Sequence, residues 1–410
     1  MKRIGAITFL LLMSINYVYA QKPTQKIRGN VYDAETMEKL PGANIILQGS
    51  DYGAISEMDG YFQIDMVEVG RYNLQVSFIG YEPLVIPELL LGSGKELVLN
   101  VALKRSILVH KDIIVKADIH KDRPVNSMSS VSARTFSVEE ARRYAGALDD
   151  PGRMAGNFAG VSPVAAHQNA IVVRGNAPKG LLWILEGVDI PAPSHFSGSN
   201  ITGGGGLTIF SSQLLANSDF YTGAFPTEFS NASAGVFDIK LRNGNNERYE
   251  YAFQVGVQGI EMAAEGPIKD GSGSSFLLNY RYSTMALIFP LLPEVKDANE
   301  LPVYQDLSFK IHIPTRKAGH FSIWGVGGLS ESSMKGYDAV ERWIYPENRK
   351  NMQFSYDMGV MGIGHILPLA AKSHIRTNIA ISAGIHQYRE DARLSETTPS
   401  ELHPLFSIES

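Results

Sequence analysis

The 410-residue sequence contains no cysteine. Disulfide bonds, thiol chemistry, cysteine-based zinc sites and a lipid-carrying N-terminal cysteine are therefore excluded. Basic residues are also few: 37 Lys and Arg stand against 42 Asp and Glu, which gives a formal net charge of −5. Because no Lys/Arg-rich run is long enough for a nucleic-acid interface, the sequence predicts no nucleic-acid partner.

Long apolar runs are missing beyond the N-terminus, where Lys2 and Arg3 precede the apolar residues 4–13. Residues 18–20 (VYA) then supply small side chains at positions −3 and −1 of a cleavage site. This order predicts a signal peptide over residues 1–20. An N-terminal membrane anchor is disfavoured, because a helical span needs about 20 apolar residues. The mature chain would be exported, and it could enter a membrane only as a β-barrel.

Residues 21–104 contain short β-type runs separated by Gly, Pro and Asp turn signals. Asp59-Gly60 can supply the positive φ that a tight hairpin needs. Leu74 and Val76 alternate with polar neighbours, as in a half-buried strand. The pattern predicts an all-β sandwich. Its expected strands are residues 26–32, 43–48, 61–64, 72–78 and 97–103.

Four segments of this region resemble the carboxypeptidase-like regulatory domain. They are residues 29–33 (GNVYD), 40–45 (LPGANI), 59–62 (DGYF) and 72–81 (YNLQVSFIGY). No peptidase is expected, because the region lacks a His/Glu/His set for zinc and its polar residues lie in turns. The resemblance implies a non-catalytic periplasmic extension of an outer-membrane receptor.

Residues 105–125 are predicted to form a linker with one strand-like patch, in which β-branched residues lie between charges. The patch is either the last strand of the sandwich or an edge strand offered to a partner by β-augmentation. An acidic residue followed by Ile and Val resembles the TonB box of outer-membrane receptors. That resemblance implies TonB of the inner-membrane energising complex as the partner. The candidate TonB box consists of Asp112, Ile113, Ile114 and Val115.

Residues 126–245 are predicted to form an α+β domain centred on residues 170–190 (AIVVRGNAPKGLLWILEGVDI). Two short apolar runs there flank a polar loop, and each run ends in a turn signal. This arrangement predicts a small, tightly turned sheet. Helices are expected from Ser137, over residues 149–158 with Pro151 near the first turn, and over residues 211–217.

Several motifs in this domain resemble the plug of TonB-dependent receptors and occur in the same order. Residues 169–175 (NAIVVRG) and 235–239 (GVFDI) match two elements of that family. Residues 222–229 (TGAFPTEF) match a third, with threonines at two positions where the family has other residues. Residues 185–188 (LEGV) stand where the family usually has an Asp-Gly turn. The resemblance implies a plug that fills a barrel.

Within this plug, Arg174 is expected to pair with Glu186 or Glu228, or to lock the plug to acidic residues on the barrel wall. Apical loops would face outward and contact a ligand. The candidate ligand-facing residues are Pro178, Lys179, His195, Phe196 and Asn200.

Other chemistry has little support in this region. His167 and His195 could be metal ligands, but isolated loop histidines are more often solvated or hydrogen-bonded. Residues 203–206 (GGGG) favour a flexible apical loop over a phosphate loop, because no Lys-Ser/Thr follows them. No Ser/His/Asp set or catalytic carboxylate pair has local support. The sequence therefore predicts neither an enzyme nor a cofactor or metal site.

Residues 246–410 alternate apolar and polar side chains, as barrel strands do. The alternation slips by one residue at Gly259, which predicts a tight turn or a bulge between two strands. Aromatics near strand ends and alternately short and long connections favour an outer-membrane barrel over a soluble β-domain. About seven antiparallel strands are expected, with residues 395–410 as the start of an outer loop, whereas a plugged barrel needs about 22 strands. One expected apolar face comprises Phe354, Tyr356, Met358 and Val360.

The expected fold is mainly β: an N-terminal sandwich, an α+β plug and an incomplete transmembrane β-barrel. The chain resembles the N-terminal part of a TonB-dependent receptor of the Bacteroidetes type. This resemblance implies energised uptake of a scarce solute such as a glycan, a peptide or a metal chelate. It places the protein in the outer membrane, with its N-terminal domain in the periplasm. The implied partners are TonB, outer-membrane lipid, the solute and a surface lipoprotein. The alternatives are a signalling or adhesion protein without transport, and a truncated remnant.

Overall fold

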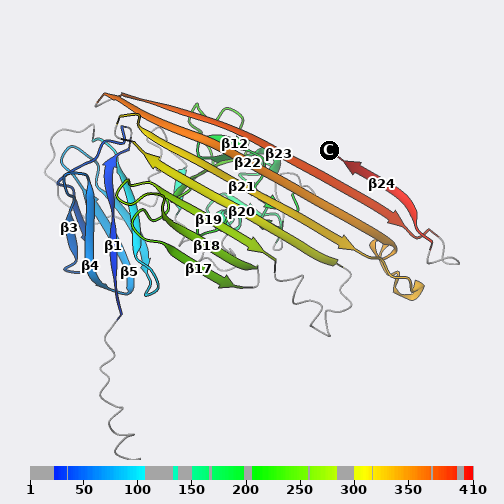
Figure 1. The fold of residues 1–410 in the computed structure, drawn as a ribbon. Coiled ribbons are helices and arrows are strands. Elements are labelled where there is room, and N and C mark those ends of the chain that lie inside the picture. Colours follow the sequence, from blue (N-terminus) through cyan, green and yellow to red (C-terminus); the bar gives the residue numbers. More distant parts are fainter. Residues whose placement is uncertain are drawn as a thin grey trace, which may run out of the picture. The chain divides into compact units, whose positions relative to one another are not determined.

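The computed structural model consists mainly of β-strands (Figure 1). It forms two compact units: of the described residues, 23–34 and 38–106 belong to the first, and 36–37 and those from 133 onward to the second. No helix among the described residues is long and apolar enough to cross a membrane. The described residues are 23–34, 36–106, 133–136, 150–165, 169–197, 206–256, 259–283, 300–315, 317–370, 373–394 and 401–409.

The N-terminal unit is a β-sandwich with one apolar core between two sheets. In the first sheet β1 pairs in parallel with β7, and Gly29 is required there because a Cβ would lie 1.6 Å from the carbonyl oxygen of Leu99. The first sheet has the order β4 (Tyr61–Glu68), β1 (Thr24–Asp33), β7 (Leu97–Leu103). The second has the order β3 (Gly53–Ile55), β2 (Asn44–Leu47), β5 (Gly70–Ser77), β6 (Leu84–Leu91).

All five strands expected in this unit are confirmed, but β3 and β6 were not predicted. The three-residue β3 is too short to show a period. In β6, Pro87 and Glu88 interrupt the alternation: Glu88 has a φ of 58°, and the register with β5 shifts at this point. A bulge of this kind hides a strand from a search for period-two patterns.

The C-terminal unit contains a plug, here the described part of residues 133–245, built on a five-stranded sheet. Its order is β12 (Val188–Ile190), β11 (Leu181–Leu185), β16 (Gly235–Ile239), β15 (Ser218–Tyr221), β8 (Ala133–Phe136). Two separate pairs join β9 (Val161–Pro163) to β10 (Ile171–Val173), and β13 (Ser194–His195) to β14 (Leu207–Thr208).

The prediction of one small sheet over residues 170–190 was wrong in part. The β11–β12 hairpin forms as expected, but β10 pairs with β9 and not with β11. β11 pairs instead in parallel with β16, which lies some fifty residues further along the chain. A partner so distant leaves no signal in the local pattern.

One expected plug helix is confirmed and one is wrong. The short helix α3 (Pro151–Ala155) begins with Pro151, and the Asp150 carboxylate accepts a hydrogen bond from Gly152 N at 2.7 Å. Residues 211–217 form no helix, because Ala216 N donates to Lys240 O and Arg242 N to Leu214 O. The helix expected from Ser137 lies outside the described residues.

The wall is an eight-stranded antiparallel sheet in sequence order, one strand more than expected. The turn at Gly259 and the alternation of short and long connections are confirmed. The last strand corrects the expected outer loop, because residues 403–409 pair with the preceding strand. The strands are β17 (Glu250–Val255), β18 (Ile260–Pro267), β19 (Ser275–Tyr282), β20 (Glu300–Pro314), β21 (His320–Met334), β22 (Lys350–Ala370), β23 (Ser373–Ala392) and β24 (His403–Glu409). β17 and β24 are the edges of this sheet as described.

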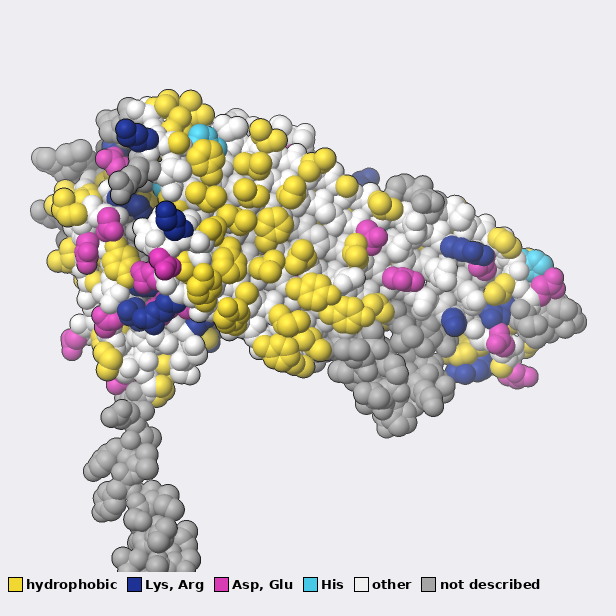
Figure 2. All heavy atoms as spheres, viewed as in Figure 1, with side chains coloured by type: hydrophobic (Ala, Val, Ile, Leu, Met, Phe, Trp, Pro, Cys, Tyr) yellow, Lys and Arg dark blue, Asp and Glu magenta, His cyan; other side chains and the backbone are white. Residues whose placement is uncertain are grey.

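The two faces of the wall differ in chemistry. Tyr251, Leu307 and Ile379, on the face away from the plug, are 79%, 46% and 70% exposed. Figure 2 shows apolar side chains spread over the sheet with few charges among them. Along each strand, polar and charged residues alternate with these apolar residues. They lie on the face toward the plug and are largely buried.

Strand β22 reverses the expected assignment of its faces. Phe354, Tyr356, Met358 and Val360 do form one apolar set, but they face the plug and belong to its core together with Trp183 and Ile209. The opposite face of β22 exposes Met361 and Ile363. Both surroundings of this strand are apolar, so alternation alone could not distinguish them.

Candidate functional site

The contact between plug and wall contains a cluster of charged and polar side chains on three neighbouring strands. Register places Glu261, Arg281 and Asp306 in one row across β18, β19 and β20. A buried charge is costly unless it is paired, so each of these groups requires a partner. The cluster comprises Glu261, Glu265, Asn279, Arg281, Asp306, Ser308 and Lys310.

The first contact joins Asp306 of the wall to the β13–β14 pair of the plug. Arg281 Nε donates to Asp306 Oδ2 at 2.8 Å, and Arg281 Nη2 donates to Thr208 O at 2.6 Å. His195 Nε2 lies 3.1 Å from the same Asp306 oxygen. A carboxylate only accepts hydrogen bonds, so Nε2 carries the proton of a neutral His195. The three side chains are at most 5% exposed.

Burial makes this contact sensitive to pH. Burial lowers the pKa of His195, and Arg281 lowers it further, although Asp306 raises it. Below about pH 6.5 the unfolded chain binds a proton at this histidine that the folded chain does not bind. The buried His195 therefore contributes its full share to the stability of the fold above that pH, and this contribution is lost as the pH falls below it.

We expect the urea concentration at the unfolding midpoint to be lower at pH 5.5 than at pH 7.5. His195→Gln should reduce this difference. The control is His403→Gln, because His403 is 43% exposed and should leave the dependence unchanged. An equal pH dependence in the wild type and in His195→Gln would contradict the assignment.

The second contact holds the β11–β12 turn, in which Glu186 and Gly187 have φ values of 53° and 85°. Lys310 Nζ of the wall lies 3.2 and 3.1 Å from the two Glu186 carboxylate oxygens and donates to Leu241 O at 2.7 Å. Glu186 Oε1 also accepts from Leu241 N at 2.6 Å. Asn378 Nδ2 of β23 donates to Glu186 O at 3.0 Å. Two wall strands therefore hold one plug turn.

The third contact lies where the plug passes into the wall. Arg242 and Glu265 form a bidentate pair, with N–O distances of 2.6 and 2.7 Å. Asn245 N donates to Glu265 Oε2 at 2.9 Å, and Asn245 Nδ2 donates to Glu250 Oε1 at 3.0 Å. Charge-assisted bidentate pairs are among the stronger polar contacts in proteins.

The structure tests one pairing of the expected lock, that of Arg174 with Glu186; the pairing of Arg174 with Glu228 stays a prediction. The Glu186 carboxylate is engaged by Lys310, so the suggested pair of Arg174 with Glu186 is not formed. Arg174 is exposed, has a φ of 50°, and donates to Thr222 Oγ1 at 3.3 Å. Glu228 is exposed on a plug loop. The plug thus supplies the acid and the wall the base at this point, the reverse of the expected polarity.

The expected ligand apex is corrected at two positions. His195 is fully buried against the wall, and Pro178 is buried in the short 3-10 turn η2 (Pro178–Gly180), so neither side chain faces outward. Lys179 is exposed. Phe196 is partly buried, and its backbone N–H donates to Ser330 Oγ at 3.2 Å. Asn200, His167, residues 203–205 and the candidate TonB box Asp112, Ile113, Ile114 and Val115 lie outside the described residues.

Sequence reasoning missed Arg242, Glu265, Arg281, Asp306 and Lys310 as contact residues. These contact residues could have been recognised as charges on the polar face of a strand whose opposite face is apolar enough to contact lipid. Such charges must point into the barrel and find partners there.

Comparison with known proteins supplies a family context. Residues 27–115 match the CarboxypepD_reg-like domain. TonB-dependent receptor P3 of Formosa agariphila is 27% identical over 147 residues, which cover 34% of this chain and 14% of that protein. TonB-dependent receptor P26 of the same organism is 29% identical over 194 residues, which cover 45% of this chain and 18% of that protein. The match thus spans less than a fifth of the length of either relative.

Among solved structures, the siderophore receptor PirA from Pseudomonas aeruginosa is similar over 64% of this chain and 44% of its own, with 12% identity and a TM-score of 0.38. The sequence matches relate the chain to the TonB-dependent receptors, with a CarboxypepD_reg-like domain as its N-terminal module.

Proposed function

We propose that this chain is the N-terminal part of a TonB-dependent outer-membrane receptor, in which the plug closes the path of a scarce solute. One observation carries the proposal: a plug with its own sheet packs on the inner face of a wall whose outer face is apolar, and the buried contacts Glu186–Lys310 and His195–Asp306 hold it there. An apolar outer face suits lipid, and paired charges suit a contact that has to open and close again.

The proposed organisation keeps the boundaries expected from the sequence. Residues 1–20 are a signal peptide, 21–104 a periplasmic sandwich, 105–125 a linker with the TonB box, 126–245 the plug, and 246–410 the barrel part. On the resemblance to Bacteroidetes-type receptors, a glycan, a peptide or a metal chelate is the proposed solute. A surface lipoprotein is a proposed further partner.

The plug sheet suggests how a pull by TonB would act. The first described element after the box is β8, an edge strand that pairs with β15 alone. Thr135 Oγ1 of β8 also donates to Asp219 Oδ1 at 2.5 Å. Tension on the TonB box reaches this four-residue edge before any interior strand of the sheet. The plug would therefore open from β8 inward.

We expect Ile114→Pro to weaken binding of the purified periplasmic domain of TonB about tenfold or more. Proline removes the N–H that strand pairing needs and restricts the residue before it. The measurement is the Kd of TonB for the purified receptor. Ile119→Pro, in the same linker but outside the box, should bind TonB normally. Equal affinities for the two variants would place the box elsewhere.

A further inference from the structure

A row of aromatic rings crosses the plug on one face of its five-stranded sheet. Neighbouring rings have centroid distances between 4.1 and 6.5 Å, and each side chain is at most 6% exposed. In order along the row they are Phe158, Phe220, Phe237, Trp183 and Phe210. Aromatic pairs at such distances attract each other beyond the effect of the area they bury. The row thus joins β15, β16 and β11 to the segments before β9 and after β14.

One end of the row is held by β8, the first described strand after the linker. Arg134 and Phe136 lie on the same face of β8, because alternate side chains of a strand point to the same side. The Arg134 guanidinium lies over the Phe158 ring, 4.2 Å from its centroid, and a cation in this position is attracted by the ring. The Phe136 ring meets that of Phe237 edge-on, with centroids 6.4 Å apart. Strand β8 is therefore attached to the row at two points.

The other end of the row lies in a plug segment that the wall holds on both sides. Phe210 stands between Thr208 and Ser211 in the chain. Thr208 O accepts a hydrogen bond from Arg281 of the wall at 2.6 Å. Ser211 Oγ donates a hydrogen bond to Glu261 of the wall. A displacement of Phe210 would therefore pull on two bonds to the wall.

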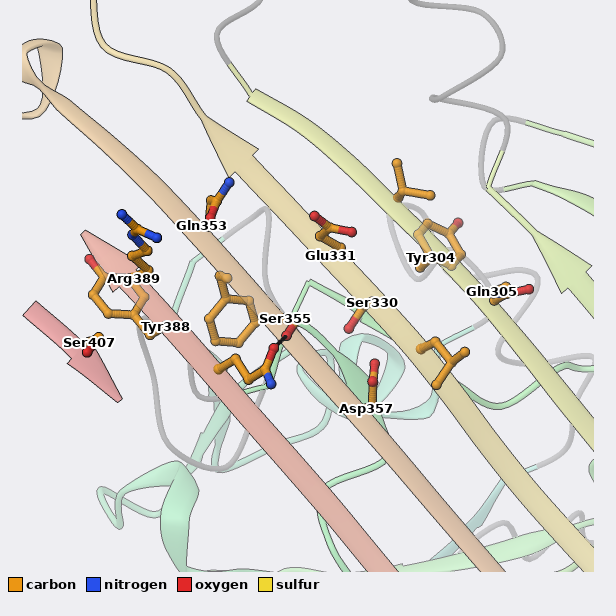
Figure 3. Close-up of a pocket in the computed structure, with 14 residues that line it drawn as sticks. Tyr304, Gln305, Ser330, Glu331, Gln353, Ser355, Asp357, Tyr388, Arg389 and Ser407 are labelled. Atoms are coloured by element: carbon orange, nitrogen blue, oxygen red, sulfur yellow. Dashed lines mark hydrogen bonds between the residues drawn. The ribbon is translucent and has the colours of Figure 1, made fainter. Parts of the chain in front are cut away.

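The strand paired with this segment is also held by the wall. Strands β13 and β14 pair with each other, so what holds one also positions the other. Figure 3 shows Tyr304 and Ser330 on the neighbouring wall strands β20 and β21. The Tyr304 ring lies 4.5 Å from that of His195, between centroids, and Ser330 Oγ accepts from Phe196 N at 3.2 Å. The wall contact thus includes both strands of the β13–β14 pair.

The fit at this contact leaves little room for intermediate positions. A Cβ added at Gly328 of the wall would lie 2.9 Å from His195 Cε1 and from Ile209 Cδ1, so the plug packs there against bare backbone. In a close-packed interior one ring cannot tilt by itself, because its neighbours fill the space around it. Contacts of this kind are either docked or released.

We propose that the aromatic row couples β8 to the wall contact at the β13–β14 pair. When β8 is pulled away, Arg134 and Phe136 leave the row, the remaining rings shift, and Phe210 draws residues 207–211 off the wall. The coupling is reciprocal, so release of residues 207–211 from the wall also loosens β8. The inference rests on the pull by TonB given under the proposed function, and names the path by which that pull reaches the wall.

The test disturbs each end of the row and measures amide hydrogen exchange at the other end, in the purified full chain in detergent. Arg134→Gln removes the cation from the Phe158 ring, and Ser211→Ala removes the hydrogen bond to Glu261. We expect Arg134→Gln to raise the exchange rate of residues 207–211 about fivefold or more, and Ser211→Ala to do the same in β8. Strand β22 is paired on both sides and serves as the reference for opening of the whole sheet.

A second pair of variants tests whether the row itself carries the coupling. Phe220→Leu removes a ring from within the row. Phe229→Leu is the matched control, because Phe229 is also buried but packs against Tyr221 in the cluster on the opposite face of the sheet. In the Phe220→Leu background, Arg134→Gln and Ser211→Ala should each affect only their own end. In the Phe229→Leu background both distant effects should remain.

The proposal is overturned if either Arg134→Gln or Ser211→Ala, in the otherwise wild-type chain, leaves exchange at the far end unchanged relative to β22. Distant effects of equal size in the Phe220→Leu and Phe229→Leu backgrounds would also overturn it. The first comparison needs no ring variant, so it decides the matter even where Phe220→Leu fails to fold. TonB affinity is measured on the same preparations. Normal TonB binding without distant effects refutes the coupling alone, and distant effects without TonB binding refute the receptor function alone.

Discussion

Asp306→Ala is expected to lower the free energy of unfolding by roughly 3–5 kcal/mol, the cost typical of leaving one member of a buried ion pair without its partner. Arg281 is only 4% exposed and would keep its charge after the carboxylate is gone. His195 would lose the acceptor for its Nε2 proton at the same time. The measurement is urea unfolding of the folded chain in detergent.

Two further variants distinguish this explanation from a general sensitivity of the sheet. Asp391→Ala breaks the exposed pair with Arg389 and should cost no more than about 1 kcal/mol. Arg281→Met combined with Asp306→Leu removes both charges, and should cost much less than Asp306→Ala alone. If Asp306→Ala were as mild as Asp391→Ala, the cluster would not hold the plug.

Lys310→Met is expected to cost roughly 3 kcal/mol and to loosen one end of the plug. Methionine keeps most of the length of the side chain but leaves the Glu186 carboxylate, 15% exposed, without its cation. It also removes the donor to Leu241 O. The effect is local, so amide hydrogen exchange should rise in β11, β12 and the residues around Leu241.

The matched control is Lys240→Met, because Lys240 pairs with Asp238 while 34% exposed and should show little change. Adding Glu186→Gln to Lys310→Met should recover part of the loss, since an amide oxygen still accepts from Leu241 N without carrying a charge. Unchanged exchange in Lys310→Met would contradict the role assigned to Lys310.

The sequence predicted most of the wall because the side-chain period of a strand is local. Strands β17 to β20 and β23 follow the alternation, with apolar residues outward and polar residues inward. Strand β22 shows the limit of this signal. Phe354 and Tyr356 are apolar because the plug covers them, and an apolar strand face does not reveal whether protein or lipid covers it. β24 was missed because its register with β23 shifts at Leu405, which interrupts the alternation within its seven residues.

The contact residues could be predicted far less well, because their partners are distant in the chain. Lys310 and Glu186 are 124 residues apart, and Asp306 and His195 are 111 apart. Each residue was visible as a charge in a strand or a turn. Only the docking of plug on wall decides which charges meet, so Arg174 was chosen for a role that Lys310 fills.

The Asn245 junction has a mechanical consequence. Besides the bonds to Glu265 and Glu250, its Oδ1 accepts from Glu247 N at 2.9 Å and from Arg248 N at 3.1 Å. It lies five residues before the first wall strand and is fully buried. A force from the N-terminus reaches it last, after β8. If the contacts at His195 and Glu186 opened, the plug would still be held to the wall at Asn245, which would act as its pivot.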